Sequence, residues 1–284
     1  MIYLYKKHIA FSVLFLIYIF TCTDYSQDTL NNSKSSDTSY SSLYSFDVHL
    51  FRTINNNRSK LLDNVLPVTD FSVFPLSIAI PVSIVIYGRT QNKYYDENTG
   101  YLLGLSEILS IGTTFTLKNI IKRKRPYLSL DIVNKKSTGF TDPYSFPSGH
   151  TCTAFTISTM FTLRYPRYPI IYIPMYAWSL IVGYGRAYFG MHYPSDILGG
   201  AIIGSLSSAL IYSLRVDIIK FKNRILKEEN KPDQNISKNI AGLYLGELIL
   251  TSFFNDFIFS SDKYQINYSL STNNSPSVGL SIHF

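Results

Sequence analysis

The stretch PSGHTCTAFTISTMFTL, residues 147–163, joins a Pro-Ser-Gly-His motif to an apolar run that contains several threonines. Serine and glycine ahead of such a run indicate a helix start, where unpaired backbone amides and the positive end of the helix dipole favour an anion. Together with four other apolar segments, this run predicts an all-α fold. The five segments are Phe71 to Gly88, Tyr101 to Ile121, Thr151 to Leu163, Tyr168 to Gly185 and Ile197 to Leu214.

These apolar segments are candidates to cross a membrane. Several approach the roughly 20 residues that span a bilayer. Charged residues make up only 16% of the 284-residue chain, against roughly 25% of a typical soluble protein. We therefore predict a helical bundle of five to six apolar helices that cross a membrane. Because Ser and Thr are frequent and the mean hydropathy is only +0.07, a buried core in a soluble helical bundle is the alternative.

The sequence also gives two further helical signals, one before the first apolar segment and one within the last. Apolar and polar residues are mixed from Phe46 to Leu66, which predicts amphipathic helices at a surface, broken by the Asn-Asn-Asn run at 55–57. In the last apolar segment, Gly200 and Gly204 lie four residues apart. This spacing predicts close packing against another helix.

The N-terminus has the pattern of an export signal. Lys6 and Lys7 precede an apolar stretch from Ile9 to Thr21 that is short for a membrane span. We predict a signal peptide or anchor over residues 1–22, followed by exported chain. Cys22 is a candidate for lipidation after cleavage.

The remaining boundaries follow from changes in composition. Alternating apolar residues from Tyr264 to Leu270 and from Val278 to Phe284 predict a β-hairpin near the C-terminus. The predicted parts are a polar linker over 23–45, a helical domain over 46–226, a linker over 227–240 and a C-terminal extension over 241–284.

Five spans would place the informative loops on one side of the membrane. If the chain enters the first span from outside, the loops Lys122 to His150 and Arg186 to Asp196 both face outside. The segment after Leu214 then faces inside, and it is basic, as the positive-inside rule expects. The basic run from Lys122 to Arg125 is on the wrong side for this rule, which suggests a chemical purpose.

Charge and cysteine content exclude several classes of function. The net charge is +7 and the pI about 9.1, which fits an anionic membrane, an anionic substrate or nucleic acid. No nucleic-acid-binding signature accompanies this charge, so we expect no nucleic acid partner. Cys22 and Cys152 are the chain's two cysteines, too few for a disulfide framework or a cysteine-based zinc centre. We therefore expect no metal.

Three clusters of polar residues lie at the outer ends of these segments. They are Lys118 with Arg125-Pro126, then Pro147-Ser148-Gly149-His150, then Arg186 with His192 and Asp196. One lysine and two arginines suit a phosphoryl group, whose equatorial oxygens carry the developing charge. Each cluster alone is more often a solvated helix end, a capped turn or a surface salt bridge, but the three in this order indicate a common site.

Two histidines and a carboxylate allow a division of labour in phosphoryl transfer. His192, with Asp196 oriented toward one ring nitrogen, can attack phosphorus with the other nitrogen. His150 can protonate the leaving alkoxide and later deprotonate water. Because Pro194 suits the first turn of a helix, we expect His192 at the lip of that helix, with its imidazole exposed to a ligand.

The three clusters resemble the three-part signature of the type 2 phosphatidic acid phosphatase superfamily, which includes bacterial acid phosphatases and vanadium haloperoxidases. The resemblance covers roughly Asp47 to Leu214. It implies the following roles: phosphate binding by Lys118, Arg125, Ser148, Gly149 and Arg186, acid/base catalysis by His150, nucleophilic attack by His192 and orientation of His192 by Asp196. Family members usually carry a serine before the third-motif arginine. Gly185 stands there, so one phosphate hydrogen bond is expected to be missing.

The resemblance implies a phosphatase acting on a phosphorylated lipid or a small phosphoester. We expect a bacterial inner-membrane enzyme whose site faces the periplasm, without a cofactor. A periplasmic soluble acid phosphatase is one alternative for the function, and a periplasmic or outer-membrane-associated position is the alternative for the location. A haloperoxidase with vanadate as cofactor is another, and a non-catalytic membrane protein that binds anionic lipid is a third.

Overall fold

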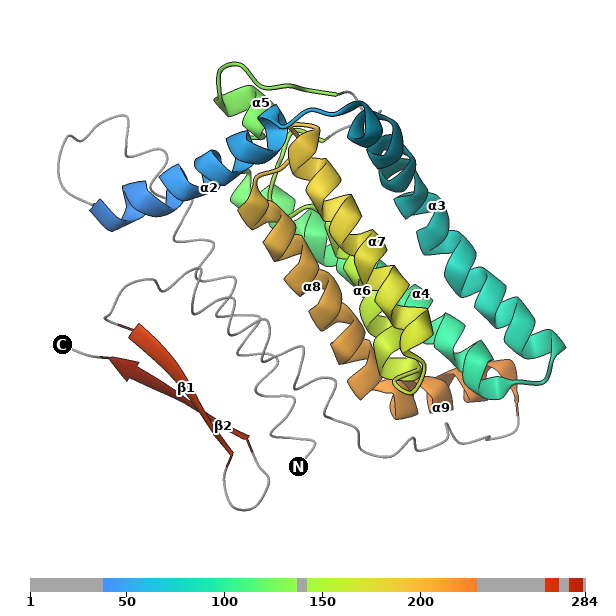
Figure 1. The fold of residues 1–284 in the computed structure, drawn as a ribbon. Helices are drawn as coiled ribbons and strands as arrows, with labels where there is room; N and C mark the ends of the chain where they lie inside the picture. The colour runs from blue at the N-terminus through green and yellow to red at the C-terminus, as the bar shows by residue number, and fades with distance from the viewer. Residues whose placement is uncertain (1–37, 137–141, 229–263, 271–275, 283–284) are drawn as a thin grey trace. The chain divides into compact units, whose positions relative to one another are not determined.

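The computed structural model describes residues 38–136, 142–228, 264–270 and 276–282. The predicted signal or anchor and Cys22 lie outside these residues. Long helices run side by side in a bundle (Figure 1), as the all-α prediction requires. They are α3 (Lys60–Thr90), α4 (Tyr94–Ile121), α6 (Gly149–Arg164), α7 (Pro169–Tyr188) and α8 (Pro194–Ser213).

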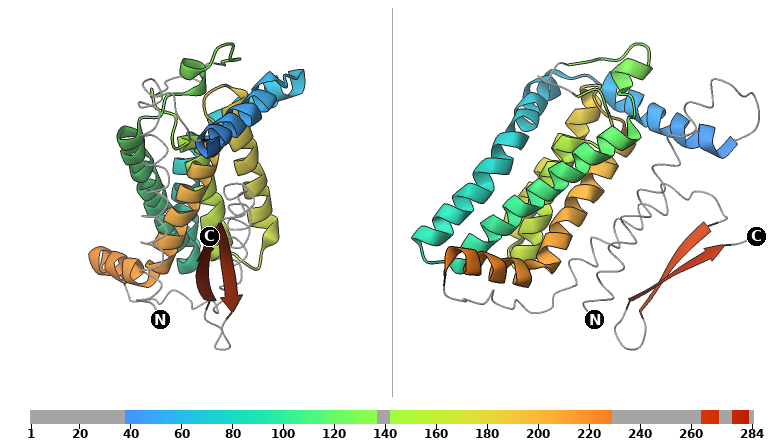
Figure 2. Two further views of the ribbon diagram at one scale, coloured as in Figure 1. Left: turned by 90° about the vertical axis from the view of Figure 1, so that its left-hand side faces the viewer. Right: turned by 180° about the vertical axis from the view of Figure 1, so that it is seen from behind.

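Further helices lie at the two ends of the bundle. Helices α2 (Thr38–Asn56) and α5 (Pro126–Ser129) lie at one end, and α9 (Arg215–Leu226) lies at the other (Figures 1 and 2). The predicted break at 55–57 is confirmed, because α2 ends and α3 begins around it. Helix α2 begins within the stretch predicted as a linker, and α9 was predicted only as a basic segment.

Helix α6 is the centre of the bundle, because it packs against α3, α4, α7 and α8. Its hydroxyl side chains do not prevent this burial. Thr156 Oγ1 donates to the carbonyl of Cys152 at 2.8 Å, and Ser158 Oγ donates to that of Ala154 at 3.0 Å. A buried hydroxyl that bonds to a carbonyl one turn earlier is satisfied within its own helix. Thr and Ser are therefore compatible with the core here.

Close contact between α6 and α8 depends on two glycines. A Cβ atom at Gly200 would lie 2.5 Å from the carbonyl oxygen of Ser148, and one at Gly204 would lie 2.1 Å from that of Cys152. Both distances are too short for a side chain. The predicted role of these glycines in close helix packing is confirmed.

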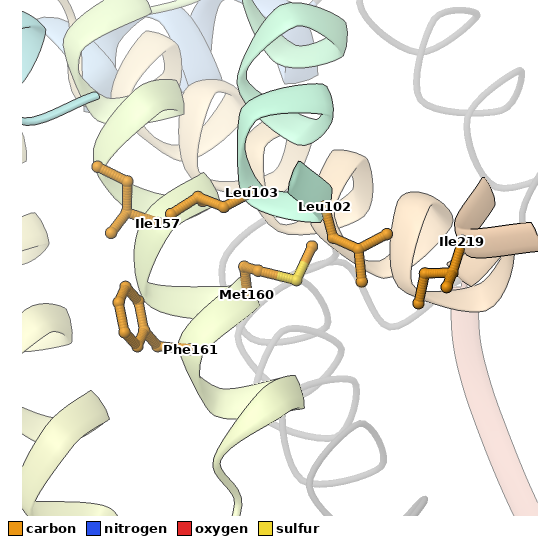
Figure 3. Packing of buried hydrophobic residues seen from close by; sticks show 6 residues of the cluster. All are labelled: Leu102, Leu103, Ile157, Met160, Phe161 and Ile219. Atoms are coloured by element: carbon orange, nitrogen blue, oxygen red, sulfur yellow. The ribbon is translucent and has the colours of Figure 1, made fainter. Parts of the chain in front are cut away.

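An apolar cluster joins α4, α6 and α9. Figure 3 shows its six buried members. They are Leu102, Leu103, Ile157, Met160, Phe161 and Ile219. Because Ile219 is only 4% exposed, α9 is packed against the bundle and is not a free tail.

The prediction of five membrane spans is met only in part. Among the described helices, α3 and α8 are long and apolar enough to cross a bilayer. Helix α6 has only 16 residues, or about 24 Å at 1.5 Å per residue. Its Thr and Ser residues, like the buried Glu107 of α4, lower the hydropathy while facing the interior of the bundle.

The C-terminal residues form a separate compact unit, whose described part is two strands. β1 (Tyr264–Leu270) and β2 (Pro276–Ile282) pair antiparallel, with Tyr264 opposite Ile282 and Leu270 opposite Pro276.

Candidate active site

The predicted site residues gather at one end of the bundle. The C-terminal ends of α4 and α7 and the N-terminal ends of α6 and α8 meet at the end where α2 and α5 lie (Figure 1). This follows from the alternating up-and-down course of the helices. Lys122 ends α4 in a left-handed conformation, with φ 54°. The chain turns there toward Arg125, the residue before α5.

Lys118 and Arg125 share one carboxylate, that of Asp142. Lys118 Nζ lies 3.2 Å from Asp142 Oδ1, and Arg125 Nη2 lies 3.1 Å from Asp142 Oδ2. Arg125 Nη1 is also 3.2 Å from Nε2 of His192. One predicted phosphate-binding cation, Arg125, therefore contacts the predicted nucleophile, and a second, Lys118, shares the carboxylate that Arg125 binds.

Arg186 and His150 meet at a second carboxylate, Asp70 of α3. Arg186 Nη1 donates to Asp70 Oδ1 at 2.5 Å, and His150 Nε2 lies 3.8 Å from the same oxygen. Within the described part of the chain, the buried Nε of Arg186 has no hydrogen-bond partner. This donor is thus available to a ligand oxygen.

His192 lies in the loop between α7 and α8, but it is not exposed as predicted. Its side chain is only 2% exposed. The backbone amides of Met191 and His192 donate to the carbonyl of Arg186, at 3.0 and 3.3 Å, which folds the loop back onto α7. Arg125 and Ser145 lie against the ring, so the expectation of an exposed imidazole was wrong.

Asp196 is close to His192, yet its oxygens are engaged by other donors. Asp196 Oδ2 lies 3.8 Å from His192 Nδ1, beyond hydrogen-bond distance. This oxygen accepts from the Ser145 hydroxyl and, at 2.8 Å, from the Tyr193 amide. Ser145 Oγ is in turn 3.5 Å from His192 Nδ1. The Ser145 hydroxyl therefore lies between the two residues that were predicted to pair directly.

Ser148 and Gly149 are at the start of α6 as predicted. The Ser148 amide donates to the carbonyl of Asp196 at 3.0 Å, and its hydroxyl lies 2.9 Å from Thr151 Oγ1. Ser148 therefore fixes α6 against α8. The anion-binding capacity of this helix start falls to the following amides, beginning with Gly149, because the first amides of a helix lack intrahelical partners.

Gly185 faces away from the charged residues. A Cβ at this position would lie 3.7 Å from Phe189 Cε2 and 3.8 Å from two side-chain atoms of Leu66. A serine there would begin among apolar atoms, so the structure gives no support to the expected loss of a phosphate hydrogen bond.

The electrostatics of the site keep His192 neutral and Asp142 charged. Burial, and then the positive charges of Arg125, Lys118 and Arg186, lower the pKa of His192 well below its ordinary value. Burial raises the pKa of Asp142, but Lys118 and Arg125 outweigh it and bring that pKa below its usual range. A neutral imidazole beside three cations is suited to attack an anionic centre.

The family match covers all of the predicted site residues. The PAP2 superfamily model matches residues 99–220. Over these residues the chain is similar to the PAP2 superfamily. Lys118, the first predicted site residue, and Asp196, the last, both fall inside the matched interval. The carboxylates of Asp70 and of Asp47, the latter on α2, precede it.

Named PAP2 relatives are similar to this chain over part of its length. It is 26% identical over 166 residues to an undecaprenyl-diphosphatase of Sulfolobus acidocaldarius, over 58% of this chain and 76% of that protein. It is 36% identical over 103 residues to a lipid A 1-phosphatase of Rhizobium etli, over 34% and 43% of the two chains. The crystal structure of Aquifex aeolicus LpxE matches 58% of this chain and 93% of its own, with 28% identity and a TM-score of 0.48.

Several residues of the site were missed from the sequence. Asp70, Asp142, Ser145 and Arg123 each contact a predicted site residue, and Asp47 contacts Arg123. One signal for Arg123 was present in the sequence: it belongs to the basic run from Lys122 to Arg125, which the prediction of five spans places on the side of the membrane that the positive-inside rule disfavours.

Proposed function

We propose that this protein hydrolyses phosphate monoesters or diphosphates of membrane lipids through a phosphohistidine intermediate at His192. The observation that carries the proposal is the 3.2 Å approach of Arg125 to Nε2 of a buried His192, inside a cluster that includes Lys118. The relatives above are named for undecaprenyl diphosphate and for lipid A 1-phosphate, which supports a lipid phosphate as substrate.

The geometry favours Nε2 of His192 as the attacking atom. Nε2 faces Arg125, whereas Nδ1 faces Ser145 Oγ at 3.5 Å and Asp196 Oδ2 at 3.8 Å. If Nδ1 carries the ring proton, the lone pair is on Nε2 and points toward the cations. As phosphorus bonds to Nε2, positive charge develops on the ring and Asp196 stabilises it.

Bond formation and cleavage then follow in two steps. Nε2 of His192 forms a bond to phosphorus while the bond to the lipid oxygen breaks, and protonated His150 donates its proton to that oxygen. Water then attacks phosphorus, His150 takes its proton, and the P–N bond breaks to release inorganic phosphate. Burial, and then the cations around it, lower the pKa of His150 to about 2. The first step therefore requires the negative charge of a bound phosphate, together with Asp70 at 3.8 Å from His150 Nε2, to favour the protonated state.

An apolar surface supports a lipid substrate and a membrane location. Helix α3 exposes a long series of large apolar side chains, among them Phe71, which is 80% exposed. Contiguous exposed apolar surface indicates contact with lipid or protein. The residues are Leu61, Val65, Val68, Phe71, Phe74, Ile78, Val82 and Ile86. Phe74 also contacts the His150 ring edge-on, with 4.6 Å between the ring centroids. This surface therefore extends to a proposed catalytic residue.

Charge supports a periplasm-facing site. Helix α9, at the opposite end of the bundle, and the residue after it carry Arg215, Lys220, Lys222, Arg224 and Lys227. By the positive-inside rule, this charge favours a cytoplasmic position for that end. The basic run at the site end does not oppose this orientation as strongly as its sequence suggests. Arg123 and Arg125 are paired with carboxylates there.

The proposal is tested on protein purified from membranes. We expect membranes to retain the protein through a high-salt wash and release it into detergent. The purified protein should then liberate phosphate, in EDTA, from a panel of undecaprenyl diphosphate, phosphatidate, phosphatidylglycerol phosphate and lipid A phosphate. A radiolabelled phosphoenzyme that is labile in acid and stable in alkali should form. EDTA is included because the described residues hold no group of three or more His, Cys, Asp or Glu that could bind a metal.

The same preparation distinguishes the alternatives. Release by salt alone would favour a soluble acid phosphatase. Halide oxidation that depends on added vanadate would favour a haloperoxidase. Absence of phosphate release from every lipid and from p-nitrophenyl phosphate would favour a non-catalytic protein that binds anionic lipid.

The Asp142→Asn variant is expected to bind inorganic phosphate and vanadate more tightly. The Asp142 carboxylate bonds to both Lys118 and Arg125, so it competes with an incoming phosphate. Asparagine keeps the Oδ1 acceptor of the Tyr144 amide but removes the charge. We expect the inhibition constants to fall roughly five- to tenfold. Asp131→Asn, at an exposed aspartate of the same loop, is the control, and unchanged or weaker inhibition in Asp142→Asn would contradict the competition.

A further inference from the structure

Arg123 is an arginine whose two terminal nitrogens bond to two different carboxylates. Nη1 donates to Asp196 Oδ1 at 2.6 Å, and Nη2 donates to Asp47 Oδ2 at 2.7 Å. The guanidinium also lies over the ring of Tyr193, 4.1 Å from its centroid. Its side chain is only 15% exposed. This member of the basic run therefore links two carboxylates inside the protein and is not a solvated surface charge.

Asp47 joins α2 to the first turn of α8. Its Oδ1 accepts from the Ser195 amide at 3.0 Å, and its Oδ2 accepts from the Ser195 hydroxyl at 2.6 Å. The Ser195 hydroxyl in turn accepts from Arg123 Nη1 at 2.7 Å. A carboxylate at the start of a helix also compensates the dipole there. Asp47 thus holds both Arg123 and the residue next to Asp196.

The Arg123 contact decides how much negative charge Asp196 presents to His192. Asp196 Oδ1 is taken by Arg123, and Oδ2 by Ser145 and the Tyr193 amide. Asp196 is fully buried, so water does not screen these charges strongly. The charged or titratable groups that act on His192 are Asp196, Arg125, Lys118, Arg186 and His150, with Asp142 beyond Arg125.

We propose that Arg123 and Asp47 form a positioning pair that fixes Asp196 and controls the protonation of His192, which makes α2 a part of the active site. The inference rests on the proposed function, because it assigns the pair a role in the reaction of His192. Burial lowers the pKa of Arg123, but Asp196 and Asp47 outweigh it and raise that pKa above its ordinary value. Arg123 therefore stays charged throughout the pH range of any assay.

Removing the positive member of the pair and removing the negative member should shift the protonation of His192 in opposite directions. In Arg123→Gln, Asp196 loses its cation and presents more negative charge to His192, so protonation of the ring becomes easier. In Asp47→Asn, Arg123 keeps its full charge for Asp196, so protonation becomes harder. Because protonated Nε2 has no lone pair for phosphorus, the acid limb of kcat/KM should move to higher pH in the first variant and to lower pH in the second.

The experiment measures pH profiles of kcat/KM with p-nitrophenyl phosphate in detergent. We expect the acid limb of Arg123→Gln to rise by about one pH unit, with kcat reduced roughly 10- to 100-fold. Arg123→Lys should bring the limb back toward that of the wild type. Lys124→Gln removes an adjacent but exposed charge and should leave the profile unchanged. Loss of kcat without any shift of the limb, or shifts of the same sign in Arg123→Gln and Asp47→Asn, would overturn the proposal.

A second measurement does not depend on turnover. In protein labelled with ¹⁵N at histidine, the Nδ1 signal of His192 reports its interaction with Asp196. It should shift in opposite directions in Arg123→Gln and Asp47→Asn, and Arg123→Lys should resemble the wild type. An Nδ1 signal that is the same in wild type and both variants would exclude the positioning pair even if the enzyme is an active phosphatase. An inactive wild type with the expected shifts would instead contradict only the proposed function.

Discussion

The His192→Ala variant is expected to lose phosphate release almost completely, with kcat lowered by ~10⁴-fold or more. In the proposed mechanism the imidazole supplies the atom that bonds to phosphorus, and its Nε2 lies 3.2 Å from Arg125 Nη1. The phosphoenzyme should disappear together with turnover, because both depend on Nε2. The measurement is the initial rate with the best lipid substrate, together with acid and alkali stability of any trapped phosphate.

Burial of His192 makes the choice of control important. Because the side chain is only 2% exposed, alanine leaves a cavity that costs stability. His192→Gln fills more of that space and should be equally inactive, and thermal unfolding of both variants shows whether they fold. His49→Ala, at an exposed histidine of α2, should retain wild-type activity. Activity of either His192 variant within tenfold of the wild type, in folded protein, would show that His192 is not the nucleophile.

The Arg186→Lys variant is expected to lose roughly 10²- to 10³-fold in kcat/KM although the positive charge is kept. Nη1 of Arg186 bonds to Asp70 while Nε has no partner among the described residues. One guanidinium can therefore hold the carboxylate and a phosphate oxygen at the same time. A lysine ammonium is a single point of contact and cannot reproduce this planar arrangement.

Inhibition by vanadate separates this effect from loss of fold. Arg186→Lys should bind vanadate more weakly, because the Nε contact to an equatorial oxygen is lost, while its thermal unfolding stays close to that of the wild type. Arg167→Lys is the matched control, since Arg167 is exposed between α6 and α7. A kcat/KM of Arg186→Lys within threefold of the wild type would show that the guanidinium of Arg186 does not hold phosphate.

Helix positions could be predicted from the sequence. Apolar runs of the right length gave α3, α4, α6, α7 and α8 because a helix that buries a face must carry apolar residues. The spacing of Gly200 and Gly204 likewise predicted the close contact of α6 with α8. The local sequence was sufficient for these two predictions, because each depends on a pattern of residues within a few helical turns.

Membrane crossing was predicted less well than helix formation. Five apolar runs suggested five spans. Among the described helices, α3 and α8 are long enough and apolar enough to cross a membrane. Hydropathy alone does not separate a residue that faces lipid from one that faces the bundle. Thr and Ser of α6 lower the average but are buried and bonded within their own helix.

The amino-acid sequence by itself determined which groups are available to the proposed phosphoryl chemistry: His150, His192 and the cations that flank them. Only the tertiary structure decided what each charge does. Asp47 meets Ser195 across 148 positions of the chain, and Asp70 meets Arg186 across 116. No local pattern encodes such pairs. The effect of a charge depends on its burial and its partner, and both are set by packing between helices that are distant in sequence.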